Sequence, residues 1–125
     1  NLKIHIIEPC GFNLHDARFK RVVMDYIGFS KVFRYEDYDK FLNKNKNKRI
    51  VLMTTKAKKN YHKFDFKKND ILLFGRESVG VPKNIHETIK NKLKIPMNKK
   101  TRSLNVAMSV AIVSAEALRQ NNLLK

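Results

Sequence analysis

The chain has little of several residue types that mark common protein classes. Its 125 residues include one cysteine, three prolines, four glycines and no tryptophan. The lone cysteine, Cys10, excludes an internal disulfide and a cysteine-rich zinc module, and it suits a reducing cytoplasm. No apolar run approaches the ~20 residues of a membrane-spanning helix, and no signal-peptide pattern opens the sequence. We therefore expect a cytoplasmic protein without a membrane partner.

Acidic residues are also scarce. There are 11 Asp and Glu against 27 Lys and Arg, which gives a formal net charge of +16. This excess favours a polyanionic partner, because each phosphate neutralised by Lys or Arg releases counterions. Many of the lysines alternate with Asn, as in NKNKNK over 43–48, and an A/T-rich genome produces such runs without selection for binding. Composition alone leaves both interpretations open.

The apolar residues, 42% of the chain, alternate between strand-like and helix-like segments. Buried or short strands are predicted over 2–8, 31–34, 49–54, 70–74 and 93–96. Helices are predicted over 16–28, 37–42, 82–90 and 104–120, and Pro82 is expected at the first helical position of the third. Alternation of this kind is typical of an α/β fold with a mostly parallel sheet and helices on both faces. The length fits a single domain over 1–125.

The last predicted helix is apolar on nearly every side. A helix of this composition has to be covered around most of its circumference. One face of a small sheet cannot do this, so the pattern favours a partner subunit that packs against the helix. A core helix within a monomer is the alternative.

Three polar or glycine-bearing segments directly follow predicted strands: 53–56, 75–82, and 95–97 leading to 102–105. In open α/β sheets the ligand crevice lies beyond the carboxyl ends of the strands, so we expect one shared pocket there. Gly75 and Gly80 permit a tight turn and a close backbone approach to a ligand. Taken alone, the segment between them is equally consistent with an ordinary loop.

Several other kinds of site are excluded by missing motifs. The sequence has no G-x-x-x-x-G-K-[ST] phosphate loop and no G-x-G-x-x-G dinucleotide fingerprint. The segment beginning at His86 resembles H-E-x-x-H, but Lys90 occupies the position of the second zinc ligand. The other histidines are scattered along the chain, so we expect no metal site.

The segments that follow the strands resemble those of one family. The motifs are IEPCGF at 7–12, LMTTK at 52–56, GRESVGVP at 75–82, IPM at 95–97 and RSLNVA at 102–107. In this order they are similar to the motifs of the SPOUT-superfamily RNA 2′-O-ribose methyltransferases, along essentially the whole chain. The branch that the chain most resembles is that of the small, domain-only enzymes that methylate the wobble cytidine or uridine of certain tRNAs.

The resemblance implies a fold, a cofactor and a set of site residues. The implied fold has a C-terminal trefoil knot and forms a homodimer through the last helix. The implied reaction transfers a methyl group from S-adenosylmethionine to a tRNA ribose without a metal. By position, Met53, Gly75, Ile95 and Ser103 resemble the family's cofactor contacts. The implied catalytic positions are Glu77, Arg102 and Asn105.

One family motif has no counterpart in the sequence. Family members begin with a strand and a helix that carry N-x-G-x-x-x-R, and Asn1 aligns just after that helix. We therefore expect that the chain lacks this strand and helix and derives from a longer protein. Alternatives to the tRNA enzyme are a catalytically impaired remnant that binds RNA or cofactor, a ribosomal RNA 2′-O-methyltransferase, and a basic α/β module without cofactor affinity.

Overall fold

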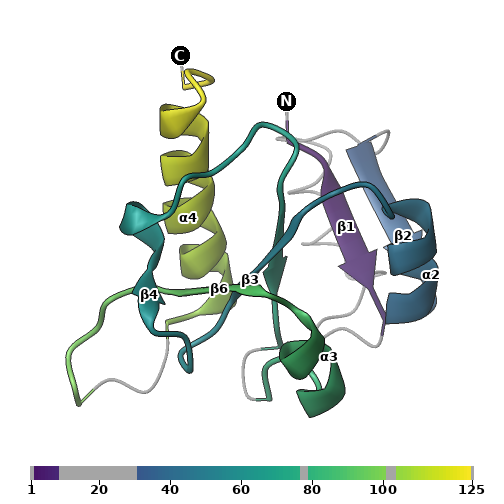
Figure 1. The fold of residues 1–125 in the computed structure, drawn as a ribbon, viewed down its shortest axis with the longest axis horizontal. Helices are drawn as coiled ribbons and strands as arrows, with labels where there is room; N and C mark the ends of the chain where they lie inside the picture. Colours follow the sequence, from purple (N-terminus) through teal and green to yellow (C-terminus); the bar gives the residue numbers. More distant parts are fainter. Residues whose placement is uncertain (1, 9–30, 77–78, 101–103, 125) are drawn as a thin grey trace, which may run out of the picture. The chain divides into compact units, whose positions relative to one another are not determined.

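The computed structural model describes residues 2–8, 31–76, 79–100 and 104–124. These residues form two compact units, 1–47 and 48–125, each of which is described by itself. Figure 1 shows the elements of both units, coloured by their position along the chain. The helix predicted over 16–28 lies outside the described residues.

The first unit contains two parallel strands and one short helix. β1 (Ile4–Ile7) pairs with β2 (Val32–Tyr35), and α2 (Tyr38–Lys44) follows. Asp37 caps α2 because its side chain accepts a hydrogen bond from the Lys40 N–H at 2.9 Å, which satisfies a donor that the first turn leaves free. These elements confirm the predictions over 2–8, 31–34 and 37–42, and each boundary differs from its prediction by one or two residues.

The second unit is built on a four-stranded parallel sheet. Its strands are β3 (Ile50–Met53), β4 (Lys59–Asn60), β5 (Ile71–Phe74) and β6 (Asn91–Lys94), in the spatial order β4-β6-β3-β5. β3 lies between β5 and β6 and is parallel to both. Met53 stands opposite Phe74 on one side and Leu93 on the other. The carboxyl ends of these strands therefore lie at the same edge of the sheet.

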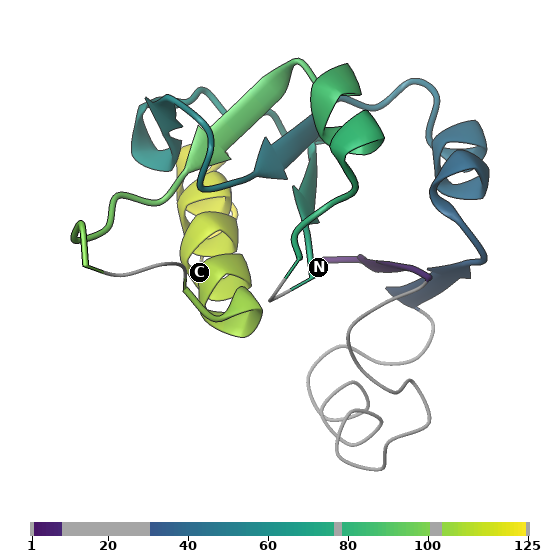
Figure 2. The ribbon, with the colours of Figure 1, turned by 90° about the horizontal axis from the view of Figure 1, so that it is seen from below.

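Both faces of β3 are covered. Val51 and Leu93 form a core with Val113 of α4 (Val106–Gln120), and all three are buried. Leu52 is also buried, although its side chain points to the opposite face. Figure 2 shows α4 and α3 (Lys83–Thr88) on opposite sides of β3 and β6. The mixed α/β fold with parallel strands is thereby confirmed.

Some element boundaries differ from the predictions. β6 begins at Asn91 and ends at Lys94, whereas the sequence predicts a strand over 93–96. Pro96 has no N–H to donate, so a strand within the sheet does not continue through it. Pro82 is the N-cap of α3 and not its first residue, and the helix ends at Thr88 because buried Ile89 is already extended.

Two short elements were missed. β4 and the 3-10 turn η2 (Tyr61–Lys63) were not predicted, since two polar residues carry no strand periodicity.

The end of α4 is hydrogen-bonded to the segment that follows η2. The Gln120 side chain donates to the Phe64 carbonyl and accepts from the Phe66 N–H, each at 2.9 Å. Asn121 donates to the Phe66 carbonyl at 3.1 Å. The side-chain amide of Gln120 thus supplies one donor and one acceptor, as the backbone of a neighbouring strand would. It anchors Phe64 and Phe66 in the core.

α4 is covered on one side only by the described residues. Val113 is fully buried, whereas Met108 is 56% exposed and Val110 is 39% exposed. Ala107, Ala111 and Ala115 are exposed as well, and they follow one another at i, i+4 and i+8 on a single face. The helix is therefore not enclosed as a core helix by the part of the chain that is described. Among the same residues, no helix is sufficiently long and apolar to cross a bilayer.

Candidate functional site

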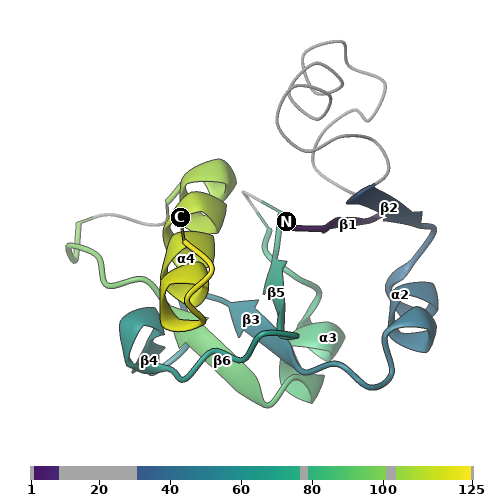
Figure 3. The same cartoon turned by 90° about the horizontal axis from the view of Figure 1, so that it is seen from above.

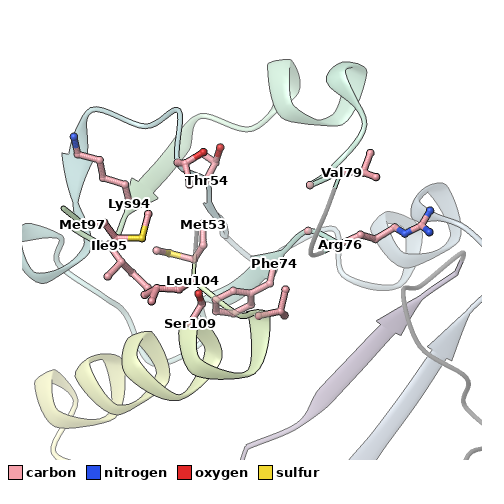
Figure 4. Close-up of a pocket in the computed structure, with 14 residues that line it drawn as sticks. Met53, Thr54, Phe74, Arg76, Val79, Lys94, Ile95, Met97, Leu104 and Ser109 are labelled. Atoms are coloured by element: carbon pink, nitrogen blue, oxygen red, sulfur yellow. The ribbon is translucent and has the colours of Figure 1, made fainter. Parts of the chain in front are cut away.

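A pocket of about 310 Å³ opens at the carboxyl edge of the second unit's sheet. It lies where β3, β5 and β6 end and where α4 begins, and Figure 4 shows its side chains. The lining residues are Met53, Thr54, Thr55, Phe74, Gly75, Arg76, Val79, Gly80, Lys94, Ile95, Met97, Leu104, Val106 and Ser109. The segments that follow β3, β5 and β6 thus meet at one pocket within the second unit, as the sequence predicts.

The pocket brings together three of the predicted cofactor residues. Met53, Gly75 and Ile95 all line it, from three different strand ends. The fourth, Ser103, lies outside the described residues, as do Glu77 and Arg102. Next to Ser103, Leu104 is part of the wall. Asn105 is not a lining residue but lies between two that are.

A tight turn closes one side of the pocket. Arg76 and Gly80 form an antiparallel bridge, with the Gly80 N–H donating to the Arg76 carbonyl at 2.7 Å. A Cβ on Gly75 would lie 2.5 Å from the carbonyl carbon of Gly80, so only glycine allows this approach. Gly80 itself has a φ of +71°, a conformation that residues with a side chain rarely adopt. Each position therefore requires glycine for a different reason: Gly75 because of the close backbone approach and Gly80 because of its positive φ.

Asn105 fixes the start of α4 at the pocket. Its side-chain oxygen accepts a hydrogen bond from the Ala107 N–H at 2.7 Å, and its carbonyl accepts from the Ser109 N–H at 3.0 Å. It is the N-cap of the helix. Val106 and Ser109, in the first turn, reach the pocket as a result.

His86 does not line the pocket but contacts a residue that does, and no sequence pattern indicated this contact. Its Nε2 lies 3.1 Å from the hydroxyl of Thr54, which lines the pocket. The Thr54 oxygen also accepts the Lys56 N–H at 3.2 Å. In the sequence, His86 stands out only as half of an incomplete zinc motif. The contact joins α3 to a strand end 32 positions earlier, and no local pattern reports such a pairing.

The walls of the pocket differ in chemistry. Figure 4 shows the side chains of Met53, Ile95, Met97 and Leu104 gathered in one apolar cluster, with Phe74 beside it. Hydroxyls come from the two threonines and from Ser109, and a cationic group comes from Lys94. Arg76 also lines the pocket, but Figure 4 shows its guanidinium directed away from the apolar cluster.

A nucleoside that carries an amino-acid tail fits such walls. The apolar cluster suits a flat base, the hydroxyls suit a ribose, and the ammonium of Lys94 suits a carboxylate. No group of three or more metal-binding side chains occurs among the residues with described positions.

The sequence matches a known family model over residues 1–115, that of the SpoU rRNA methylase family. The chain belongs to this family. A tRNA (cytidine(34)-2′-O)-methyltransferase of Ancylobacter novellus is 40% identical over 121 residues, which are 95% of this chain and 77% of the relative. The resemblance to RNA 2′-O-ribose methyltransferases is confirmed by these matches.

Solved structures of related proteins have the same fold. One, described as concerning the 2-OH methylation of C/U34 on tRNA, is 31% identical with a TM-score of 0.86. The match covers 96% of this chain and 79% of that one. An AdoMet-bound rRNA methyltransferase from Sinorhizobium meliloti has a TM-score of 0.83 at 21% identity, with 98% of this chain and 47% of the other covered. The second match shows the likeness of the fold only.

Proposed function

We propose that the chain transfers a methyl group from S-adenosylmethionine to the 2′-hydroxyl of nucleotide 34 in a tRNA. The observation that carries this proposal is the pocket, because it is formed by the strand ends that bear the family's motifs. The 40% identity to a tRNA (cytidine(34)-2′-O)-methyltransferase supports the choice of nucleotide. The family description names rRNA, and an rRNA substrate is therefore the second candidate.

The pocket residues suit the cofactor in distinct ways. When bound, S-adenosylmethionine supplies an electrophilic methyl group on a sulfonium. The side chains of Met53, Ile95 and Leu104 offer an apolar slot for the adenine. The turn between Gly75 and Gly80 brings backbone close to the ribose, and Ser103 completes the predicted set of contacts. These roles follow the family's motifs and the positions of the described lining residues.

Positioning is the main contribution that the protein's own residues make. Methyl transfer to a ribose hydroxyl needs an in-line approach and removal of a weakly acidic proton. We assign Glu77 and Asn105 to ordering the site, and Arg102 to contact with the RNA backbone. Asn105 can order the site through its cap, because the hydrogen bond from the Ala107 N–H to its side chain holds the first turn of α4 at the pocket.

The proposal includes a homodimer formed through α4 and a C-terminal trefoil knot. The exposed apolar face of α4 supports the dimer, because Met108 and Val110 lie on the surface of the described part of the chain. Replacing Met108 with Glu would bury a charge in that interface. We expect Met108→Glu to shift the sedimentation of the protein from dimer to monomer, while Ser109→Ala leaves it a dimer. Since tRNA is the substrate, we infer a cytoplasmic protein.

Tritiated methyl transfer to unmodified tRNA tests the proposal. We expect label at the 2′-oxygen of nucleotide 34, and strongly reduced label with Asn105→Ala. Ribosomal RNA fragments serve as the competing substrate in the same assay. Label on rRNA alone would favour the second candidate.

Calorimetry with S-adenosylhomocysteine distinguishes the enzyme from a protein that only binds. Heat of binding without methyl incorporation would identify a remnant that keeps the cofactor site. Absence of both would leave a basic α/β module and end the proposal.

A further inference from the structure

The positive charge of the chain is concentrated in its second unit. Residues 48–125 hold 18 of the 27 Lys and Arg but only 5 of the 11 Asp and Glu. Each of the four acidic residues described there already has a cationic partner. The pairs are Asp65 with Lys67, Asp70 with Arg49, Glu87 with Lys83, and Glu116 with Arg119. The remaining lysines of this unit therefore have no described carboxylate left to pair with.

Six of these lysines are exposed along one edge of the sheet. We call them the lysine edge: Lys56, Lys58, Lys59, Lys63, Lys99 and Lys100. They come from the segment around β4 and η2 and from the loop after β6. β4 is the outermost strand and pairs with the end of β6. Figures 1 and 3 show β4 and the loop after β6 on the same side of the unit.

The lysine edge continues directly from the pocket. Thr55 lines the pocket and Lys56 follows it; Met97 lines the pocket and Lys99 follows two residues later. Lys94, on β6, belongs to the pocket itself, and Figure 4 shows its ammonium directed away from the apolar cluster. A chain of anionic groups at the mouth of the pocket would therefore lie beside segments that carry these ammonium groups.

We propose that the lysine edge binds the phosphates of the RNA strand whose ribose is brought to the mouth of the pocket. The inference rests on the proposed function and adds the surface that holds the substrate. Lysine is suited to this task because its ammonium contacts phosphate as a point charge without reading the base. The lysines of the described ion pairs suit this role less well, because a carboxylate within 3.9 Å offsets part of the charge of each.

The test compares two triple variants that lose the same charge. One carries Lys58→Gln, Lys63→Gln and Lys99→Gln. The control carries Lys40→Gln, Lys67→Gln and Lys83→Gln, and each of these lysines is ion-paired in the structure. Binding of a fluorescent tRNA anticodon stem-loop is measured by anisotropy across a range of KCl concentrations. The melting temperature of each variant shows whether it is folded.

We expect the edge variant to bind more than tenfold more weakly. Its salt slope should fall by about 2, because each phosphate that is no longer neutralised lowers the slope by ~0.7. The control should keep the wild-type slope. Equal slopes for the two variants, or a wild-type slope for the edge variant, would overturn the inference. Methyl transfer plays no part in this readout. If the wild type transfers no methyl group but its salt slope still falls in the edge variant, the proposed function is wrong and the inference about the lysine edge stands.

Discussion

Replacing Gly75 with alanine should open the turn that closes the pocket. The added Cβ would lie 2.5 Å from the Gly80 carbonyl carbon and 2.6 Å from both the Gly80 Cα and the Val81 nitrogen. Ordinary contacts of this kind are about 3.5–4.0 Å. All three atoms belong to the backbone, so no side-chain rotation relieves the overlap. The strand end and the turn have to separate by roughly 1 Å, since that is the difference between these distances.

The energetic cost has two parts. Overpacking of this kind costs about 1–3 kcal/mol. The two hydrogen bonds between Arg76 and Gly80 would add about 1 kcal/mol each if both are broken. We therefore expect the free energy of unfolding to fall by roughly 3–5 kcal/mol if both bonds are broken. Because four residues of this turn line the pocket, the dissociation constant for S-adenosylhomocysteine should rise by at least tenfold, which corresponds to about 1.4 kcal/mol.

Urea denaturation and isothermal calorimetry measure the two effects, and Gly80→Ala is the matched control. Nothing lies within 4 Å of a Cβ at Gly80, but its φ is +71°. That variant therefore carries only the left-handed strain of about 1–2 kcal/mol without a displaced backbone. The reasoning is refuted if Gly75→Ala is as stable as the wild type, or if Gly80→Ala weakens ligand binding more than Gly75→Ala does.

Three further predictions concern single side chains. Asn105→Ala should lower the free energy of unfolding by about 1 kcal/mol because α4 loses its cap, while Asn105→Asp keeps the cap and the stability; thermal melting compares them. His86→Leu and Thr54→Val should each weaken S-adenosylhomocysteine binding about fivefold, since one hydrogen bond is worth about 1 kcal/mol, and calorimetry of the double variant should show no additional loss. The hydrogen bond from Arg119 lowers the pKa of Glu116 from 4.5 to about 2. Glu116 therefore contributes stability that is complete above pH 4.5 and is lost as the pH falls toward 2. The melting temperature of Arg119→Gln should accordingly lie below that of the wild type at about pH 6, and the two should converge in acid. A difference in melting temperature that stays the same at every pH would contradict this.

The sequence predicted β3 and β5 as strands and the meeting of the segments that follow the strands at one pocket, and it did so for a physical reason. Buried parallel strands such as β3 appear in the sequence as short apolar runs bounded by polar residues or glycine. Parallel strands present their carboxyl ends at one edge, so the segments after them have to meet. The family's motifs singled out three residues at the ends of these strands, and all three line the pocket: Met53, Gly75 and Ile95.

The features that were missed depend on contacts between distant segments. β4 consists of Lys59 and Asn60, whose pairing is imposed by β6 and not by their own side chains. The bond between His86 and Thr54 arises because α3 packs near the end of β3. Among the described ion pairs of the second unit, only that of Arg49 with Asp70 joins distant segments, and the other three join residues two to four positions apart. Such features depend on tertiary packing, which a one-dimensional pattern does not record.

The hydrogen bonds of the Gln120 side chain fix the number of residues in α4 between the pocket and the end of the helix. One end of the helix carries Ser109 at the pocket, and the other end carries Gln120 at the backbone of Phe64 and Phe66. Inserting or deleting one residue between them would rotate the amide by about 100° and move it by about 1.5 Å, away from both of its partners. Sequence drift in this helix is thus restricted to substitutions. Any homologue with a gap between these two positions must have another way to secure the segment beside η2.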